Sequence, residues 1–311
     1  MVINIRFIEL LIKILEKDFL DETLYNQFIK TKGIKGFLNH QNSFGKIIER
    51  DYIKEELIKV IDDKHYEDVY EFYKLKDNIV QLKSDIQFIN ENNDLIIKTV
   101  LKEVYKIVPK EIPFKSKIYL YCGGIDGGFT INRKDIFINY GKYIGEGEEF
   151  IKVLIHEMYH SRKLPIENRI IFLFKLITRK NRLLYETIGK TIEEGIACLA
   201  QHGPNLKKDD LTGNLTKRQL LLAKEQFELI NDILINIKSG KTCKKGKKHL
   251  NIYVIGYLIV SAIYKEKGVF ILDDWTLDLN FRRIIKEYVE LCNGNGIPPG
   301  FTDEVVEWLI K

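Results

Sequence analysis

The chain has 311 residues, of which 45% are hydrophobic, 30% are charged and only 6 are proline. This composition is typical of an ordered globular protein and excludes a mainly disordered chain. The 49 basic and 44 acidic side chains leave a net charge of only +5, so we expect no nucleic-acid partner.

Cysteine spacing and hydropathy bear on the compartment. The four cysteines are far apart and form no Cys-x-x-Cys pair, which predicts free thiols in a reducing compartment. The apolar N-terminal stretch is interrupted by charged residues, and no segment approaches ~18 uninterrupted apolar residues. We therefore expect a cytoplasmic protein without a membrane partner. The sequence does not indicate an oligomeric state.

The N-terminal part of the chain has its apolar residues mostly at helical spacing, as Phe7 and Leu11 illustrate. This pattern predicts a helical region over residues 1–110. Glycines and asparagines gather at residues 33–45 and 90–94, and we expect loops there.

The pattern changes after residue 110, and we expect a second domain over residues 111–311. Short β-branched and aromatic runs separated by glycine-rich turns predict a small antiparallel or mixed sheet. Its strands are expected at residues 117–122, 128–131 and 135–140. Helical patterns then return at residues 148–161, 167–178, 183–201, 216–237, 248–267 and 302–311. The predicted fold class is α+β, predominantly helical.

One dense positive run lies at residues 238–249, KSGKTCKKGKKH. Lysine clusters that glycine interrupts are typical of solvated loops. Contact with a phosphate backbone or an acidic substrate is the alternative.

The segment VLIHEMYHS contains His156, Glu157 and His160. On a helix, positions i and i+4 lie on one face, so both imidazoles can bind one metal ion while Glu157 stands near its open position. The surrounding helix is apolar nearly all round and should be buried, and a metal ion would satisfy these buried polar groups. A buried hydrogen-bonded network without metal is the alternative.

Catalytic zinc requires a third protein ligand. Lys163 and Ile166 stand where a metzincin has its glycine and third histidine, which excludes that class. Glu194, in TIEEGIACLA, shares a helix face with small residues that allow a close approach to the metal. Glu193 lies on a face that we expect to be solvated, so Glu194 is the preferred ligand. Two weaker candidates are Glu186 and Glu167.

A His-Glu-x-x-His motif followed by Glu-Glu-Gly-Ile-Ala resembles the gluzincins. The aminopeptidase-N-like members carry Asn-Glu-Gly-Phe-Ala, and its glutamate, which corresponds to Glu194, is their third metal ligand. They also have a Tyr-x-x-Gly helix whose tyrosine stabilises the oxyanion. By this resemblance Tyr253, in Tyr253-Val-Ile-Gly256, takes that role, with Tyr257 as the alternative. Over about residues 117–268 the chain also resembles bacterial proteins described as zinc-dependent peptidases.

The sequence departs from these enzymes at three places. CGGIDGGF, at residues 122–129, stands where aminopeptidases carry Gly-x-Met-Glu-Asn, so the glutamate that holds a substrate amine is missing. Cys198 occupies the position of an aspartate that orients a ligand histidine in thermolysin-like enzymes. Arg162 stands where zincins usually have an apolar residue. The first departure favours an endopeptidase over an aminopeptidase.

The sequence thus predicts a zinc-dependent hydrolase, a gluzincin-type metallopeptidase with one Zn²⁺ per chain and a peptide or protein substrate. Glu157 would accept a proton from the attacking water. Two alternatives are a non-catalytic zinc-binding interaction module and a zinc hydrolase of a non-peptide substrate. The strand at residues 135–140 could be an exposed edge that binds an extended peptide, or an ordinary core strand.

Overall fold

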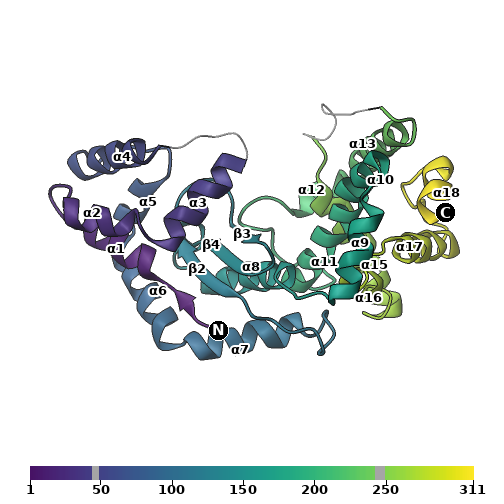
Figure 1. Cartoon of the computed structure of the whole chain (residues 1–311), viewed down its shortest axis with the longest axis horizontal. Helices are drawn as coiled ribbons and strands as arrows, with labels where there is room; N and C mark the ends of the chain where they lie inside the picture. The colour runs from purple at the N-terminus through teal and green to yellow at the C-terminus, as the bar shows by residue number, and fades with distance from the viewer. Residues whose placement is uncertain (44–48, 242–248) are drawn as a thin grey trace. The chain divides into compact units, whose positions relative to one another are not determined.

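The computed structural model describes residues 1–43, 49–241 and 249–311 (Figure 1). The expected basic loop at residues 238–249 lies mostly outside the described residues. The chain is predominantly helical with one small mixed sheet, which confirms the predicted α+β class. No helix among the described residues is both long and apolar enough to cross a bilayer.

Contacts divide the chain into two compact units. The first unit comprises residues 1–102 and 114–161, and the second comprises residues 103–113 and 162–311. Compact contact units need not be independently folding domains, so the expected boundary between residues 110 and 111 stays a prediction.

The sheet of the first unit has four strands in the order β1-β2-β4-β3. Their bounds are β1 Ile3–Asn4, β2 Lys117–Tyr121, β3 Gly128–Ile131 and β4 Asp135–Asn139. β1 pairs parallel to β2 and β2 parallel to β4, whereas β3 pairs antiparallel to β4. β1 lies in a segment expected to be helical, because two residues are too few to show a strand period.

The sheet order decides between the two alternatives for the strand at residues 135–140. The strand at residues 135–140 is not an exposed edge, because β4 is paired on both sides by β2 and β3. Four of its five residues are buried, as in a strand whose two faces are both covered. β1 and β3 are the edge strands of the sheet.

Helices make up most of the rest of the first unit. Their bounds are α1 Arg6–Leu15, α2 Glu22–Phe28, α3 Lys32–Ser43, α4 Arg50–Asp62, α5 Phe72–Asp77, α6 Ile79–Glu91, α7 Asn93–Val104 and α8 Gly147–His160, with a 3₁₀ turn at Tyr140–Lys142.

Both loops expected in the N-terminal part are wrong for the residues that the structure describes, and residues 44 and 45 of the first loop lie outside them. Residues 33–43 belong to α3, whose two glycines serve close packing: a Cβ at Gly33 would lie 3.0 Å from the Leu120 carbonyl, and one at Gly36 would overlap the Phe137 ring. Residues 90–94 contain only a one-residue break at Asn92, where the side chain donates to the Phe88 carbonyl at 2.9 Å.

The second unit is helical. Its bounds are α9 Ile166–Lys175, α10 Arg179–Leu184, a π-helical turn at Tyr185–Gly189, α11 Lys190–His202, α12 Lys217–Leu221, α13 Ala223–Lys238, α15 Ile252–Lys267, α16 Asp273–Thr276, α17 Arg282–Gly294 and α18 Asp303–Ile310. The helix expected at 183–201 is interrupted by the π turn, and the one expected at 216–237 breaks at Leu222. α16 and α17 were not predicted.

Two glycines set the distance between α11 and α15. A Cβ at Gly195 would overlap the backbone of Gly256, and a Cβ at Gly256 would overlap the carbonyl of Thr191. The two helices therefore pack backbone to backbone. This contact matters for the site because Gly195 directly follows Glu194, and Gly256 lies one turn after Tyr253.

Candidate metal centre

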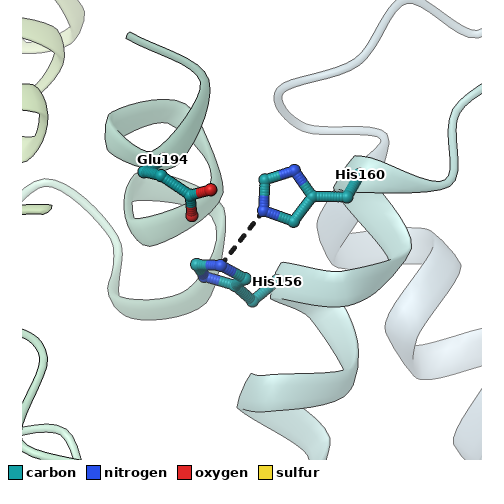
Figure 2. Close-up of side chains that lie close together, drawn as sticks. All are labelled: His156, His160 and Glu194. Atoms are coloured by element: carbon teal, nitrogen blue, oxygen red, sulfur yellow. Dashed lines mark hydrogen bonds between the residues drawn. The ribbon is translucent and has the colours of Figure 1, made fainter. Parts of the chain in front are cut away.

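The two histidines of α8 share one face of that helix, as their spacing predicts. The Nε2 atoms of His156 and His160 lie 3.2 Å apart (Figure 2). His156 is buried, with 8% of its surface exposed, and His160 is half-buried at the last turn. The helix that carries them is largely buried and has two glutamates in its first turn, which favour its start there.

Glu194 of α11 joins these histidines. One ligand atom from each of His156, His160 and Glu194 lies within 4.8 Å of the other two, as Figure 2 shows. Tetrahedral zinc with Zn–N bonds of about 2.0–2.1 Å places two nitrogen ligands roughly 3.3 Å apart. The 3.2 Å between the imidazole nitrogens fits this spacing. Two imidazoles and one carboxylate are also a donor set of catalytic zinc sites, which leave a fourth position open. The residues present therefore fit zinc.

Glu157 is buried beside the two histidines on α8, with 5% of its surface exposed. The Thr130 hydroxyl of β3 lies 2.9 Å from Glu157 Oε2 and can donate to it. Gly128 lies on the same face of β3 as Thr130, and a Cβ there would stand 3.1 Å from Glu157 Cγ. The edge strand thus holds one carboxylate oxygen in place.

Thr130 was missed by sequence reasoning. The only local signal is the i, i+2 spacing of Gly128 and Thr130, which puts a position with no side chain and a hydroxyl on one strand face. That spacing does not reveal which helix faces the strand.

Glu193 does not face solvent, and this expectation is wrong. Its carboxylate forms two hydrogen bonds with the guanidinium of Arg162, from Nη1 to Oε1 at 2.8 Å and from Nη2 to Oε2 at 2.7 Å. Trp275 Nε1 also donates to Oε2 at 2.6 Å, and Arg162 Nε donates to the Thr276 carbonyl at 3.1 Å. Arg162 is fully buried, and 13% of the Glu193 side chain is exposed.

The ion pair between Arg162 and Glu193 explains why a charged residue, Arg162, stands where zincins usually have an apolar one. Arg162 follows His160 by two residues, and its partner Glu193 directly precedes Glu194. The bidentate geometry fixes α11 against the segment that follows the metal-binding motif. The two adjacent glutamates of α11 therefore have different partners, Arg162 for one and the histidines for the other.

The two tyrosines of α15 differ in their surroundings. Tyr257 is buried, and its hydroxyl donates to the Gly203 carbonyl at 2.8 Å. Burial raises the pKa of Tyr257 to about 12, so its phenol stays neutral. Tyr253 lies in the first turn of α15, half-buried, where Asn251 caps the helix by accepting from the amides of Tyr253 and Val254. The hydroxyl of Tyr257 is therefore already engaged in a hydrogen bond within the second unit.

The remaining positions that the sequence singled out are not members of the cluster. Cys198 is buried among Leu215, Val254 and Tyr257, and burial raises the pKa of its thiol well above the ordinary value. It is a neutral core residue. The two weaker ligand candidates, Glu186 and Glu167, are exposed and do not belong to the His156–His160–Glu194 group.

Comparison with known proteins identified a matching family. The sequence model of the family described as "Putative zinc dependent peptidase (DUF5700)" matches residues 25–296. A search of curated proteins and a search of solved structures each returned no match. The matched range begins in α2 and so covers most of the N-terminal helices, which lie outside the resemblance noted over residues 117–268.

Proposed function

Because the chain belongs to this family of zinc-dependent peptidases, we propose that it is a gluzincin-type metallopeptidase that holds one zinc ion through His156, His160 and Glu194. The observation that carries the proposal is the convergence of one ligand atom from each of these residues within 4.8 Å. A bound zinc ion would polarise the substrate carbonyl and lower the pKa of a water in its fourth position towards ~7.

Glu157 is the proposed general base. It neighbours His156 on α8 but is not needed as a ligand, and the Thr130 hydroxyl supports one of its oxygens. In the proposed reaction its carboxylate accepts a proton from the attacking water and returns it to the leaving amine. Such a positioned base typically contributes about 10²–10⁴-fold to the rate.

Tyr253 is the proposed oxyanion donor, a role that rests on its resemblance to the gluzincin Tyr-x-x-Gly helix. One observation supports choosing it over Tyr257, because the Tyr257 hydroxyl already donates to Gly203. The close contact between Gly195 and Gly256 brings the first turns of α15, which carry both tyrosines, to the helix that carries Glu194.

The proposed substrate is a peptide cleaved within its chain. Residues 122–129 provide no glutamate for a free amino terminus, which favours an endopeptidase. β3 is the edge strand beside α8, and an extended peptide could pair with such an edge.

Metal analysis tests the ligand set. Wild-type protein purified without chelator should carry one zinc per chain by mass spectrometry of the metal. His160→Ala and Glu194→Gln should lose most of it because three-ligand sites depend on each donor. Glu186→Gln, an exposed acid that precedes the same helix, is the matched control and should keep its zinc. Equal zinc in all four proteins would refute the proposed ligands.

A further inference from the structure

α9 exposes a large apolar face. Its residues at positions i, i+4, i+7 and i+8 lie on one side of the helix, and a further isoleucine follows its end. The exposed fractions are Ile166 69%, Ile170 49%, Leu173 65%, Phe174 67% and Ile177 67%. None of the ten residues of α9 is buried. Single exposed apolar residues are ordinary, but a continuous stripe of five marks an interaction surface.

The opposite side of α9 is attached to the second unit. The Phe172 ring packs edge-on against Tyr185 with centroids 5.1 Å apart. The Asn168 amide donates to the Leu277 carbonyl at 3.1 Å and to Asp278 Oδ1 at 2.7 Å. α9 is therefore a docked helix, and its apolar stripe faces away from the contacts that hold it.

The same segment carries the charge of the chain. Residues 163–182 contain six lysines and arginines against one acidic residue, an excess of five. This excess equals the formal net charge of the whole chain, so the remaining residues balance one another. Four of these cations are exposed and form no ion pair with any described residue: Lys163, Arg169, Arg179 and Arg182.

We propose that α9 and the cations around it, residues 163–182, dock the protein on an anionic membrane surface. Apolar residues on one face of a helix, flanked by lysine and arginine, are the pattern of helices that lie in the membrane interface. The stripe would enter the boundary between headgroups and acyl chains, and the cations would contact lipid phosphates. This goes beyond the proposed peptidase activity.

The positive charge of residues 163–182 favours an anionic membrane over a second copy of the chain as the partner of the stripe. Pairing two α9 faces would bring two segments of like charge together, which is unfavourable, whereas an anionic bilayer complements them. The sequence-based expectation of no membrane partner rested on the lack of a spanning segment. An interfacial helix needs no such segment.

Vesicle co-sedimentation tests the proposal with the full-length protein. We expect binding to vesicles of phosphatidylcholine mixed with phosphatidylserine, weak binding to phosphatidylcholine alone, and loss of binding as salt is raised. Phe174→Asn should weaken binding about tenfold by removing the largest apolar side chain of the stripe. Arg179→Gln and Arg182→Gln should each weaken it about fivefold.

Two variants elsewhere serve as controls. Leu221→Asn replaces an apolar side chain that is 86% exposed, and Lys224→Gln replaces a lysine whose side chain is 89% exposed. Both should bind like wild type. All these positions are exposed, so the variants should fold normally.

Three results would overturn the proposal. Binding to both vesicle types alike would show no role for anionic lipid, and absence of binding to the mixed vesicles at low salt would show no docking. The third is a wild-type dimer by light scattering that Phe174→Asn converts to a monomer. In that case a second copy covers the stripe.

Discussion

Two helices of the second unit depart from the usual inside-outside pattern in opposite directions. α11 carries two half-buried glutamates, whereas α9 presents apolar residues to solvent. Both departures cost free energy unless a partner compensates for them. On α11 the partners are side chains of the chain itself and the proposed zinc. The described residues do not cover the apolar stripe of α9, which points to a partner outside the chain.

α11 also shows that neighbouring residues of one type can serve different ends. Glu193 is bound by Arg162 and Trp275, so its charge is neutralised within the fold. Glu194 lies with the two histidines of α8. Glu193, which has a cation of its own, therefore has a structural role, whereas Glu194, which converges with the histidines, is the proposed metal ligand.

The largest effect on stability should come from breaking the buried pair. Arg162→Met leaves the Glu193 carboxylate without its cation, and we expect the free energy of unfolding to fall by about 3–5 kcal/mol in urea titrations. The matched control on the exposed helix, Arg169→Met, should change it by at most ~0.5 kcal/mol. Similar losses for both variants would remove the contrast between the two helices.

The two tyrosines of α15 provide a second comparison, between a proposed catalytic residue and a structural one. Tyr253→Phe should keep zinc and fold but lower turnover about 10²–10³-fold, because the phenol would act only on charge that develops in the transition state. Tyr257→Phe should keep turnover and lose about 1 kcal/mol of stability, since it removes the hydrogen bond to Gly203. Peptidase assays and thermal unfolding of both variants decide between them, and the opposite result would exchange their roles.

Asp273 provides the smallest test, because it is a half-buried acid whose Oδ1 has no hydrogen-bond partner among the described residues. Burial, and then the charges of Asp274 and Glu111, raise the pKa of Asp273 to about 6. Because the folded-state pKa lies above the unfolded value, its contribution to stability is present below about pH 4 and is lost as the pH rises through about 6.

Asp273→Asn removes that buried charge. We expect it to stabilise the protein by about 1 kcal/mol at neutral pH, less than the full pKa difference implies because water still reaches part of the carboxyl group. The gain should vanish below about pH 4. A gain that is independent of pH would show that the charge of Asp273 is not its cause.

Local patterns were enough to predict most helices and the two histidines. His156 and His160 sit on one helix, so their shared face follows from spacing alone. Glu194 could be chosen because its small neighbours and its resemblance to a known motif are also local. Thr130 and the partner of Arg162 could not be predicted, since they depend on which distant segments meet. β1 was too short to show a period, and the glycines of α3 suggested a loop where they serve close packing.

The most direct test of the account concerns Glu157, which the zinc does not need but the proposed chemistry does. Glutamine at this position keeps the shape of the side chain but cannot accept a proton. A mixed-peptide library digested with wild type and with Glu157→Gln, and analysed by mass spectrometry, measures the difference. We predict cleavage by wild type and at least ~10²-fold less by the variant, with zinc content unchanged. Equal cleavage by both proteins would contradict the role of Glu157 as the general base.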